Sequence, residues 1–253
     1  MSTLRRDWPP LAERINTSLP KGTDPLVAQW MGLVAKAAQM NLDADDALPH
    51  RAFVELIAEA RGFDSTEQHT IGDAFDHLQL AIELADDVAD WDDDVERERP
   101  HVQLLSQIPA GARPALPIAS TLACAACVAK IGGDRIALTL SKMTAIGSRM
   151  VVGQGRDDEE GQIALASGEQ ALLLGLPMWL DSATTAHEQQ EFDTWARAWG
   201  LTWELAQRVK ERRARPSQLA NAMERCRELW PDIVPFRRGE ALAMATLMPS
   251  GMS

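Results

Sequence analysis

Apolar residues recur along most of the chain at the three- and four-residue spacing of amphipathic helices, whereas the alternation typical of strands is scarce. Ala, Leu, Glu, Gln, Met and Arg dominate these stretches and favour helices. Proline and glycine mark the gaps between them. The pattern predicts helices over residues 25–41, 51–61, 66–95, 115–131, 134–154, 168–184, 188–213, 216–229 and 238–247.

The predicted helices carry no sign of a domain boundary. A chain of 253 residues has the length for two domains or for one large helical domain with a sizeable core. We find no repeat of fixed period, no low-complexity linker and no shift in composition. The sequence therefore predicts a single all-α domain over residues 1–253.

Composition narrows the choice of partners. The net charge of −12 argues against nucleic acid or an anionic membrane as the main partner, but not against a phosphorylated ligand that binds as its magnesium complex. The first ten residues lack the apolar core of a signal peptide. The nearly charge-free run 114–129 is too short and too rich in small residues for a membrane span. We expect a cytoplasmic protein without a membrane span.

Acidic residues gather at the end of the helix predicted over residues 66–95. On a continuous helix five of them fall within an arc of roughly 120°. We call these five the acid cluster: Asp86, Asp87, Asp90, Asp93 and Asp94. They continue a mostly apolar stripe that includes Phe75 and Ile82, and their mutual repulsion calls for a cation. Hard carboxylate oxygens at this spacing suit Mg²⁺. The alternative is a helix that simply ends in a solvated, acidic surface.

Two further patterns are weaker by themselves. Gly153, Gln154 and Asp157 lie at the end of another predicted helix, where a glycine permits either close packing or ligand approach. Trp195 and Trp199, with a third tryptophan four residues later, form a stripe that indicates either a packed core or the wall of a cavity.

Taken together, the acid cluster and the segment around Gln154 resemble the trans-isoprenyl diphosphate synthases, a family of class I isoprenoid synthases. The family's DDxxD motif matches Asp86, Asp87 and Asp90, and its GQxxD motif matches Gly153, Gln154 and Asp157. Its LRRGxP segment appears as residues 95–100, and the resemblance spans residues 18 to 212. It implies an all-α helical bundle around a central apolar cavity, Mg²⁺ as cofactor, and a homodimer.

The chain departs from the family pattern in the second aspartate-rich motif, where Arg208 and Lys210 stand among residues 207–211. A lysine–threonine pair expected after GQxxD is replaced by Gly168 and Glu169. The family's KRxRP segment keeps Lys21 but loses both arginines. Gln79 stands where the family has a histidine, and only the second of two adjacent arginines remains, as Arg97.

The resemblance assigns roles to the matching residues. Asp86, Asp87 and Asp90 are expected to bind Mg²⁺ and, with Gln154, to form the catalytic group. Candidates for contact with the diphosphate groups of substrates are Lys21, Gln79, Arg97, Gln154, Arg208 and Lys210. Two alternatives remain open for the lost metal platform. Glu204, Glu211 or the acidic run 157–160 holds the third ion, or Arg208 and Lys210 supply positive charge in its place.

The implied activity is a Mg²⁺-dependent prenyl transfer. An allylic prenyl diphosphate of C10–C20 ionises, and the prenyl group passes to isopentenyl diphosphate or to a specialised acceptor, with release of pyrophosphate. Two alternatives remain open because the second motif and the second-substrate pocket are depleted. One is a terpene synthase (cyclase) that uses a single prenyl diphosphate. The other is a non-catalytic regulatory subunit of a prenyl synthase.

Overall fold

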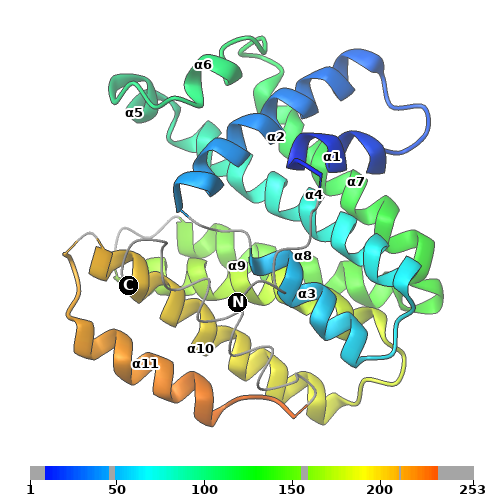
Figure 1. Ribbon diagram of the computed structural model, residues 1–253, viewed down its shortest axis with the longest axis vertical. Helices are drawn as coiled ribbons and strands as arrows, with labels where there is room; N and C mark the ends of the chain where they lie inside the picture. The colour runs from blue at the N-terminus through cyan, green and yellow to red at the C-terminus, as the bar shows by residue number, and fades with distance from the viewer. Residues whose placement is uncertain (1–8, 46–48, 155–158, 211, 233–253) are drawn as a thin grey trace.

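The structure is a computed structural model that describes residues 9–45, 49–154, 159–210 and 212–232 (Figure 1). Within these ranges it is built of helices and contains no strand, which confirms the all-α prediction. The α-helices are α1 Leu11–Ser18, α2 Pro25–Asp45, α3 Pro49–Ala60, α4 Ser65–Ala89, α5 Trp91–Glu96, α6 Val102–Leu105, α7 Leu116–Ile131, α8 Ile136–Gln154, α9 Glu159–Leu180, α10 Ala186–Lys210 and α11 Pro216–Glu228, with 3₁₀ turns η1 Arg113–Ala115 and η2 Gly133–Arg135.

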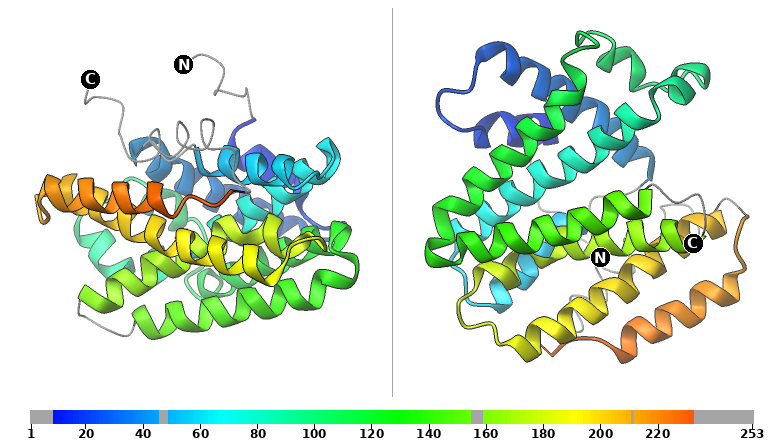
Figure 2. Two further views of the ribbon diagram at one scale, coloured as in Figure 1. Left: turned by 90° about the horizontal axis from the view of Figure 1, so that it is seen from below. Right: turned by 180° about the vertical axis from the view of Figure 1, so that it is seen from behind.

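Helix α4 is the central element, since it contributes to both hydrophobic clusters of the described residues. Phe75 and Leu78 pack into the larger cluster, which α3, α7, α8, α9, α10 and α11 complete. Leu80 and Leu84 pack into the smaller one, formed with α1, α2 and the α6 region. The views in Figure 2 show α4 between these two groups of helices. Burial on both sides fixes the direction in which its acidic end leaves the core.

The start of α4 is fixed by a capping box. The Asp64 carboxylate accepts hydrogen bonds from the Thr66 and Glu67 backbone amides at 2.8 and 2.9 Å, and the Glu67 side chain accepts one from the Asp64 amide at 2.9 Å. Such caps satisfy backbone donors that the first helical turn leaves without partners. By fixing where α4 begins, the cap also fixes the direction in which the acidic side chains of its last turn point.

The helix predicted over residues 66–95 is divided in the structure, because α4 ends at Ala89 and α5 begins at Trp91. Asp90 joins them with φ −97° and ψ 14°, outside the helical range. Carboxylates are unfavourable at the negative C-terminal end of a helix and favourable in its first turn. A break at Asp90 places Asp92, Asp93 and Asp94 in the first turn of α5. The charge pattern therefore favours the break, and the single continuous arc of the acid cluster was wrong.

Helices α1 and α9 also differ from the prediction. Helix α1 was not predicted, because its eight residues follow two prolines; burial of Leu11 and Ile15 in the smaller cluster stabilises it. Helix α9 begins at Glu159 rather than at residue 168. The helix predicted over 238–247 lies outside the described residues, so the single domain over 1–253 stays a prediction.

Helix α7 revises the expectation that the nearly charge-free run 114–129 is too short for a membrane span. Together with η1 it forms a stretch, Arg113–Ile131, of 19 residues that is long and apolar enough to cross a membrane by length and composition. A third of it is buried, and α7 packs along α4. Ile118 and Leu122 remain 62% and 64% exposed on its outer face.

A buried ionic network ties α1, α3 and α4 together. Arg14 donates two hydrogen bonds to the Asp76 carboxylate, at 2.7 and 3.0 Å, and Arg51 donates a further one to the same group. Arg51 also donates to Glu55 at 3.0 Å. Because Asp76 and Arg51 are almost fully buried, each charge depends on its partners. Gly72 makes room, since a Cβ there would lie 2.6 Å from the Arg51 guanidinium.

The tryptophan stripe belongs to the core. Trp195 stacks on Phe53 and on Trp199, with ring centroids 5.5 and 6.2 Å apart, and meets Trp230 edge-on. Trp195 and Trp199 are buried in the larger cluster. Of the two interpretations of the stripe, these contacts support the packed core.

Candidate functional site

The segments that carry the predicted motifs reach the same side of the molecule. The C-terminal ends of α4, α8 and α10 all point to that side, and α5 lies beside the end of α4 (Figures 1 and 2). The acid cluster and the C-terminal ends of α8 and α10 therefore lie at one end of the bundle, although long stretches of sequence separate them.

Asp86 and Asp90 form the exposed part of the acid cluster. Both side chains are accessible to solvent, one in the last turn of α4 and one at the joint with α5. Desolvation by the surrounding protein raises the pKa of Asp86, although its side chain still reaches solvent, and the charges of Asp90 and Asp94 raise it further. A carboxylate held among like charges at a helix C-terminus is stabilised when a cation binds.

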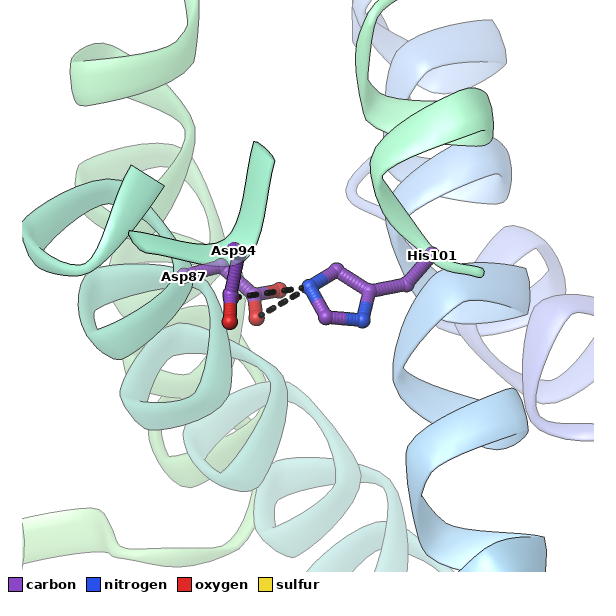
Figure 3. A group of neighbouring side chains, drawn as sticks. All are labelled: Asp87, Asp94 and His101. Carbon is purple, nitrogen blue, oxygen red and sulfur yellow. Dashed lines mark hydrogen bonds and ion pairs between the residues drawn. The ribbon is translucent and has the colours of Figure 1, made fainter. Parts of the chain in front are cut away.

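Asp87 belongs to a different environment from its neighbour. It is 8% exposed, and burial raises its pKa to about 6, an effect that His101 opposes and the other acids reinforce. Nε2 of His101 lies 3.4 Å from Asp87 Oδ1 and 3.1 Å from Asp94 Oδ2 (Figure 3). The residues Asp87, Asp94 and His101, which we call the Asp–His group, thus bring together α4, α5 and the segment that leads into α6.

His101 was missed by the sequence analysis. No helical spacing relates it to the acids, because the chain turns between them through Glu98, whose φ is +52°. The only signal was its place directly after Pro100, at the end of the segment that resembles LRRGxP.

Glu169 links the acid cluster to the opposite helices. Its pKa is raised to about 7, first by burial and then by the charges of Asp86 and Glu204. Acids on α4, α9 and α10 therefore lie close enough at this site for their charges to interact. On α10, the Glu204 carboxylate accepts a hydrogen bond from Arg208 at 2.6 Å. An ion pair therefore lies close to where the resemblance expects a second aspartate-rich motif.

The remaining candidates on α4 and α5 lie near the acids along the chain. Gln79 is half-buried on α4, two turns before Asp86. Arg97 is exposed at the end of α5, with Nη2 3.7 Å from Asp93 Oδ2. A role for either residue in ligand binding stays a prediction.

Other candidates are not brought to the acids or are not described. Lys21 lies in the connection between α1 and α2, which sits at the opposite end of α2 from α5 (Figures 1 and 2). Gln154 and Lys210 end α8 and α10, but their side chains lie outside the described part of the structure, as does Asp157. The structure thus places the ends of these helices without fixing the groups they carry.

A surface groove of about 310 Å³ lies away from this site, over α8 and the first half of α10. Its lining includes Lys142, Gln189, Asp193 and Arg197, and none of the candidate residues. The central apolar cavity implied by the resemblance stays a prediction.

Comparison with known proteins identifies a shared fold. No family model matches the chain, and no curated protein matches its sequence. Among solved structures, it is similar to a geranylgeranyl pyrophosphate synthetase from the archaeon Geoglobus acetivorans, with a TM-score of 0.55 and 13% identity over 93% of this chain and 89% of that one. The chain therefore shares the all-α fold of that protein. At this identity the likeness carries the fold and leaves the reaction to be argued from the site.

Proposed function

We propose that this protein is a Mg²⁺-dependent prenyltransferase. It ionises an allylic prenyl diphosphate of C10–C20 and transfers the prenyl group to isopentenyl diphosphate or to a specialised acceptor, with release of pyrophosphate. The observation that carries the proposal is the acid cluster at the end of α4, within electrostatic reach of Glu169 and, through it, of α10, in a helical isoprenoid-synthase fold.

The residues present fit a magnesium site. Asp86 and Asp90 offer exposed carboxylate oxygens one helical turn apart, the kind of ligand that Mg²⁺ prefers together with substrate phosphates. Asp87, paired with His101, orients this platform from its buried side. When bound, Mg²⁺ supplies electrophilic stabilisation of the negative charge that develops on the departing diphosphate.

Basic residues on the same side complete the diphosphate site. Arg208 on α10 and Arg97 after α5 carry positive charge, and Gln154 and Lys210 end helices that reach this region. The positive charges of Arg97, Arg208 and Lys210 attract the diphosphate and do part of the work that a further metal ion would do. Glu204 orients the Arg208 guanidinium through its 2.6 Å hydrogen bond. Gln79, two turns along α4, lines the approach to the reacting end of the prenyl chain.

A terpene cyclase is the second candidate function, and the position of Lys21 favours it. The connection that holds Lys21 lies away from the acid cluster, so the predicted anchor for isopentenyl diphosphate is separated from the site. A cyclase needs no such anchor, because the allylic cation reacts with a double bond of its own chain.

The deciding experiment measures Mg²⁺-dependent pyrophosphate release from C10, C15 and C20 allylic diphosphates, each with and without isopentenyl diphosphate, with product analysis. Release that requires isopentenyl diphosphate supports chain elongation. Release without it, accompanied by a cyclic product, supports the cyclase. Absence of release under every condition contradicts both activities with these substrates and directs the search to a specialised acceptor or to an active partner of a non-catalytic subunit.

A pair of variants tests the assignment of the site. Asp86→Asn with Asp90→Asn should reduce release to background while the far-ultraviolet circular dichroism is kept. Asp92→Asn, an exposed acid in the same segment but outside the acid cluster, is the matched control and should retain turnover. Normal Mg²⁺-dependent turnover by the double variant would refute the metal assignment.

The same proposal includes a homodimer in the cytoplasm. The outer face of α7 exposes Ile118 and Leu122, an apolar pair one turn apart that a second copy would cover. Sedimentation equilibrium of the wild-type chain and of Leu122→Asp should show a dimer and a shift toward monomer, respectively.

A further inference from the structure

The Asp–His group has the spacing of a metal-binding site. The three ligand atoms, one from each of Asp87, Asp94 and His101, lie within 4.8 Å of one another, and the imidazole Nε2 points at both carboxylates (Figure 3). In a tetrahedral site with bonds of about 2.0–2.1 Å, neighbouring ligand atoms lie about 3.4 Å apart. The observed nitrogen–oxygen distances are 3.1 and 3.4 Å.

The ring of His101 presents a single nitrogen, Nε2, to both carboxylates. Within the described residues, the buried Nδ1 has no hydrogen-bond partner, and His101 is only 4% exposed. Nε2 carries at most one N–H, although two carboxylates converge on it. A cation among the three groups satisfies both carboxylates and the Nε2 lone pair together.

We propose that Asp87, Asp94 and His101 form a second metal site, which takes a divalent transition-metal ion such as Zn²⁺ and is separate from the Mg²⁺ platform of Asp86 and Asp90. Imidazole nitrogen is a good ligand for Zn²⁺ and Co²⁺, whereas Mg²⁺ selects oxygen. The proposal goes beyond the proposed function and does not depend on it, since the site needs no diphosphate.

The two sites lie on different sides of the end of α4. Successive helical residues point about 100° apart, and Asp86 acts on Glu169 of α9, whereas Asp87 meets His101 before α6. The Asp87 and His101 side chains are also buried, while Asp86 and Asp90 are exposed. An ion at the Asp–His group would thus hold the segment from α5 to α6 against α4, and would fix the base of the loop that carries Arg97.

The test uses the full chain without diphosphate and in a large excess of Mg²⁺, which fills the oxygen-only sites. Co²⁺ is titrated, and its visible d–d absorption reports a low-symmetry site that includes nitrogen. Zn²⁺ should displace Co²⁺ and should raise the melting temperature as its concentration increases. We expect one tight equivalent of Co²⁺ per chain, with intense tetrahedral-type absorption that persists in excess Mg²⁺.

Variants assign the absorption to the three residues. His101→Gln and Asp94→Asn should each weaken Co²⁺ binding by roughly a hundredfold or more, since even outer-shell substitutions at metal sites cost 10- to 100-fold. His187→Gln is the matched control, because His187 is an exposed histidine that lies 3.4 Å from Glu191 and also pairs with a carboxylate. It should leave the titration unchanged.

Three results would overturn the proposal. They are an absence of Co²⁺ absorption in excess Mg²⁺, binding that survives both His101→Gln and Asp94→Asn, or binding that is lost in His187→Gln. Should Asp94→Asn fail to fold, His101→Gln decides alone, because glutamine keeps a polar side chain of similar size. Pyrophosphate release plays no part in the readout, so failure of this site and failure of the proposed prenyl transfer are distinguishable.

Discussion

Gly200 on α10 lies so close to Ser167 on α9 that a Cβ at Gly200 would come within 2.4 Å of the Ser167 Cα. The Ser167 hydroxyl donates a hydrogen bond to the Arg197 carbonyl at 3.2 Å, and Trp199 Nε1 donates one to Gln170 Oε1, also at 3.2 Å. This contact fixes the register of α9 and α10. Glu169 lies two residues after Ser167 on α9, and Glu204 lies four residues after Gly200 on α10, near enough for the charge of Glu204 to act on Glu169.

Gly200→Ala should destabilise the protein by about 1–3 kcal/mol, the usual cost of overpacking, because the added methyl group meets backbone atoms that cannot move independently of α9. Gly147→Ala on α8 is the matched control, since nothing lies within 4 Å of a Cβ there and alanine favours a helix. Urea unfolding followed by circular dichroism gives both values. Equal midpoints for the two variants would contradict the close contact.

Glu169→Gln should raise stability at alkaline pH. The folded-state pKa of about 7 lies above the ordinary value of 4.5, so the folded protein holds a proton that the unfolded chain releases. Stability due to this group is therefore present below pH 4.5 and is lost as the pH rises to about 7. In metal-free buffer the variant should melt a few degrees higher than wild type at pH 8, roughly the shift that a small stability gain gives a chain of this size. At pH 4 the variant and wild type should melt at the same temperature.

The control for Glu169 is Glu224→Gln, an exposed acid on α11. Its melting temperature should follow that of wild type at both pH values. A Glu169→Gln protein that is less stable than wild type at pH 8 would mean that the carboxylate is charged and well paired in the folded state, contrary to its surroundings of Asp86 and Glu204.

Asp76→Asn should destabilise the protein by about 3–5 kcal/mol, the usual cost of removing one partner from a buried ion pair. The carboxylate accepts hydrogen bonds from both Arg14 and Arg51, and the Arg51 guanidinium is almost fully buried. Glu228→Gln removes an exposed partner of Arg225, a pair 2.8 Å apart, and should change stability by less than about 0.5 kcal/mol. Similar losses for the two variants in urea unfolding would show that the buried network is not required.

The long helices could be predicted from the sequence because their apolar spacing is regular. Helix α7 was expected over 115–131 and spans 116–131, and α10 was expected over 188–213 and spans 186–210. Helix α1 was missed because its eight residues depend on packing of Ile15 rather than on local preference. Short helices are marginal without such tertiary contacts.

The sequence predicted only the part of the candidate site whose residues are close together along the chain. The DDxxD-like spacing pointed to the end of α4, where the structure has the exposed Asp86 and Asp90. His101 could not be found in this way, because it reaches Asp87 and Asp94 only after the chain turns at Glu98. The influence of Asp86 on Glu169 depends on the packing of α4 against α9, which no local pattern contains.

His77 predicts how the protein responds to acid. It is fully buried on α4, with Nε2 2.9 Å from the Ser18 hydroxyl, and burial lowers its pKa to about 4. Between pH 6.5 and about 4 the His77 ring is protonated in the unfolded chain but not in the folded protein. The stability that this group contributes is therefore present above pH 6.5 and is lost as the pH falls to about 4. The difference corresponds to at most about 3 kcal/mol. His77→Gln should flatten this part of the stability profile, measured by urea unfolding between pH 4 and 7, whereas the exposed His187→Gln should leave it unchanged. A profile as steep in His77→Gln as in wild type would assign the acid sensitivity to another group.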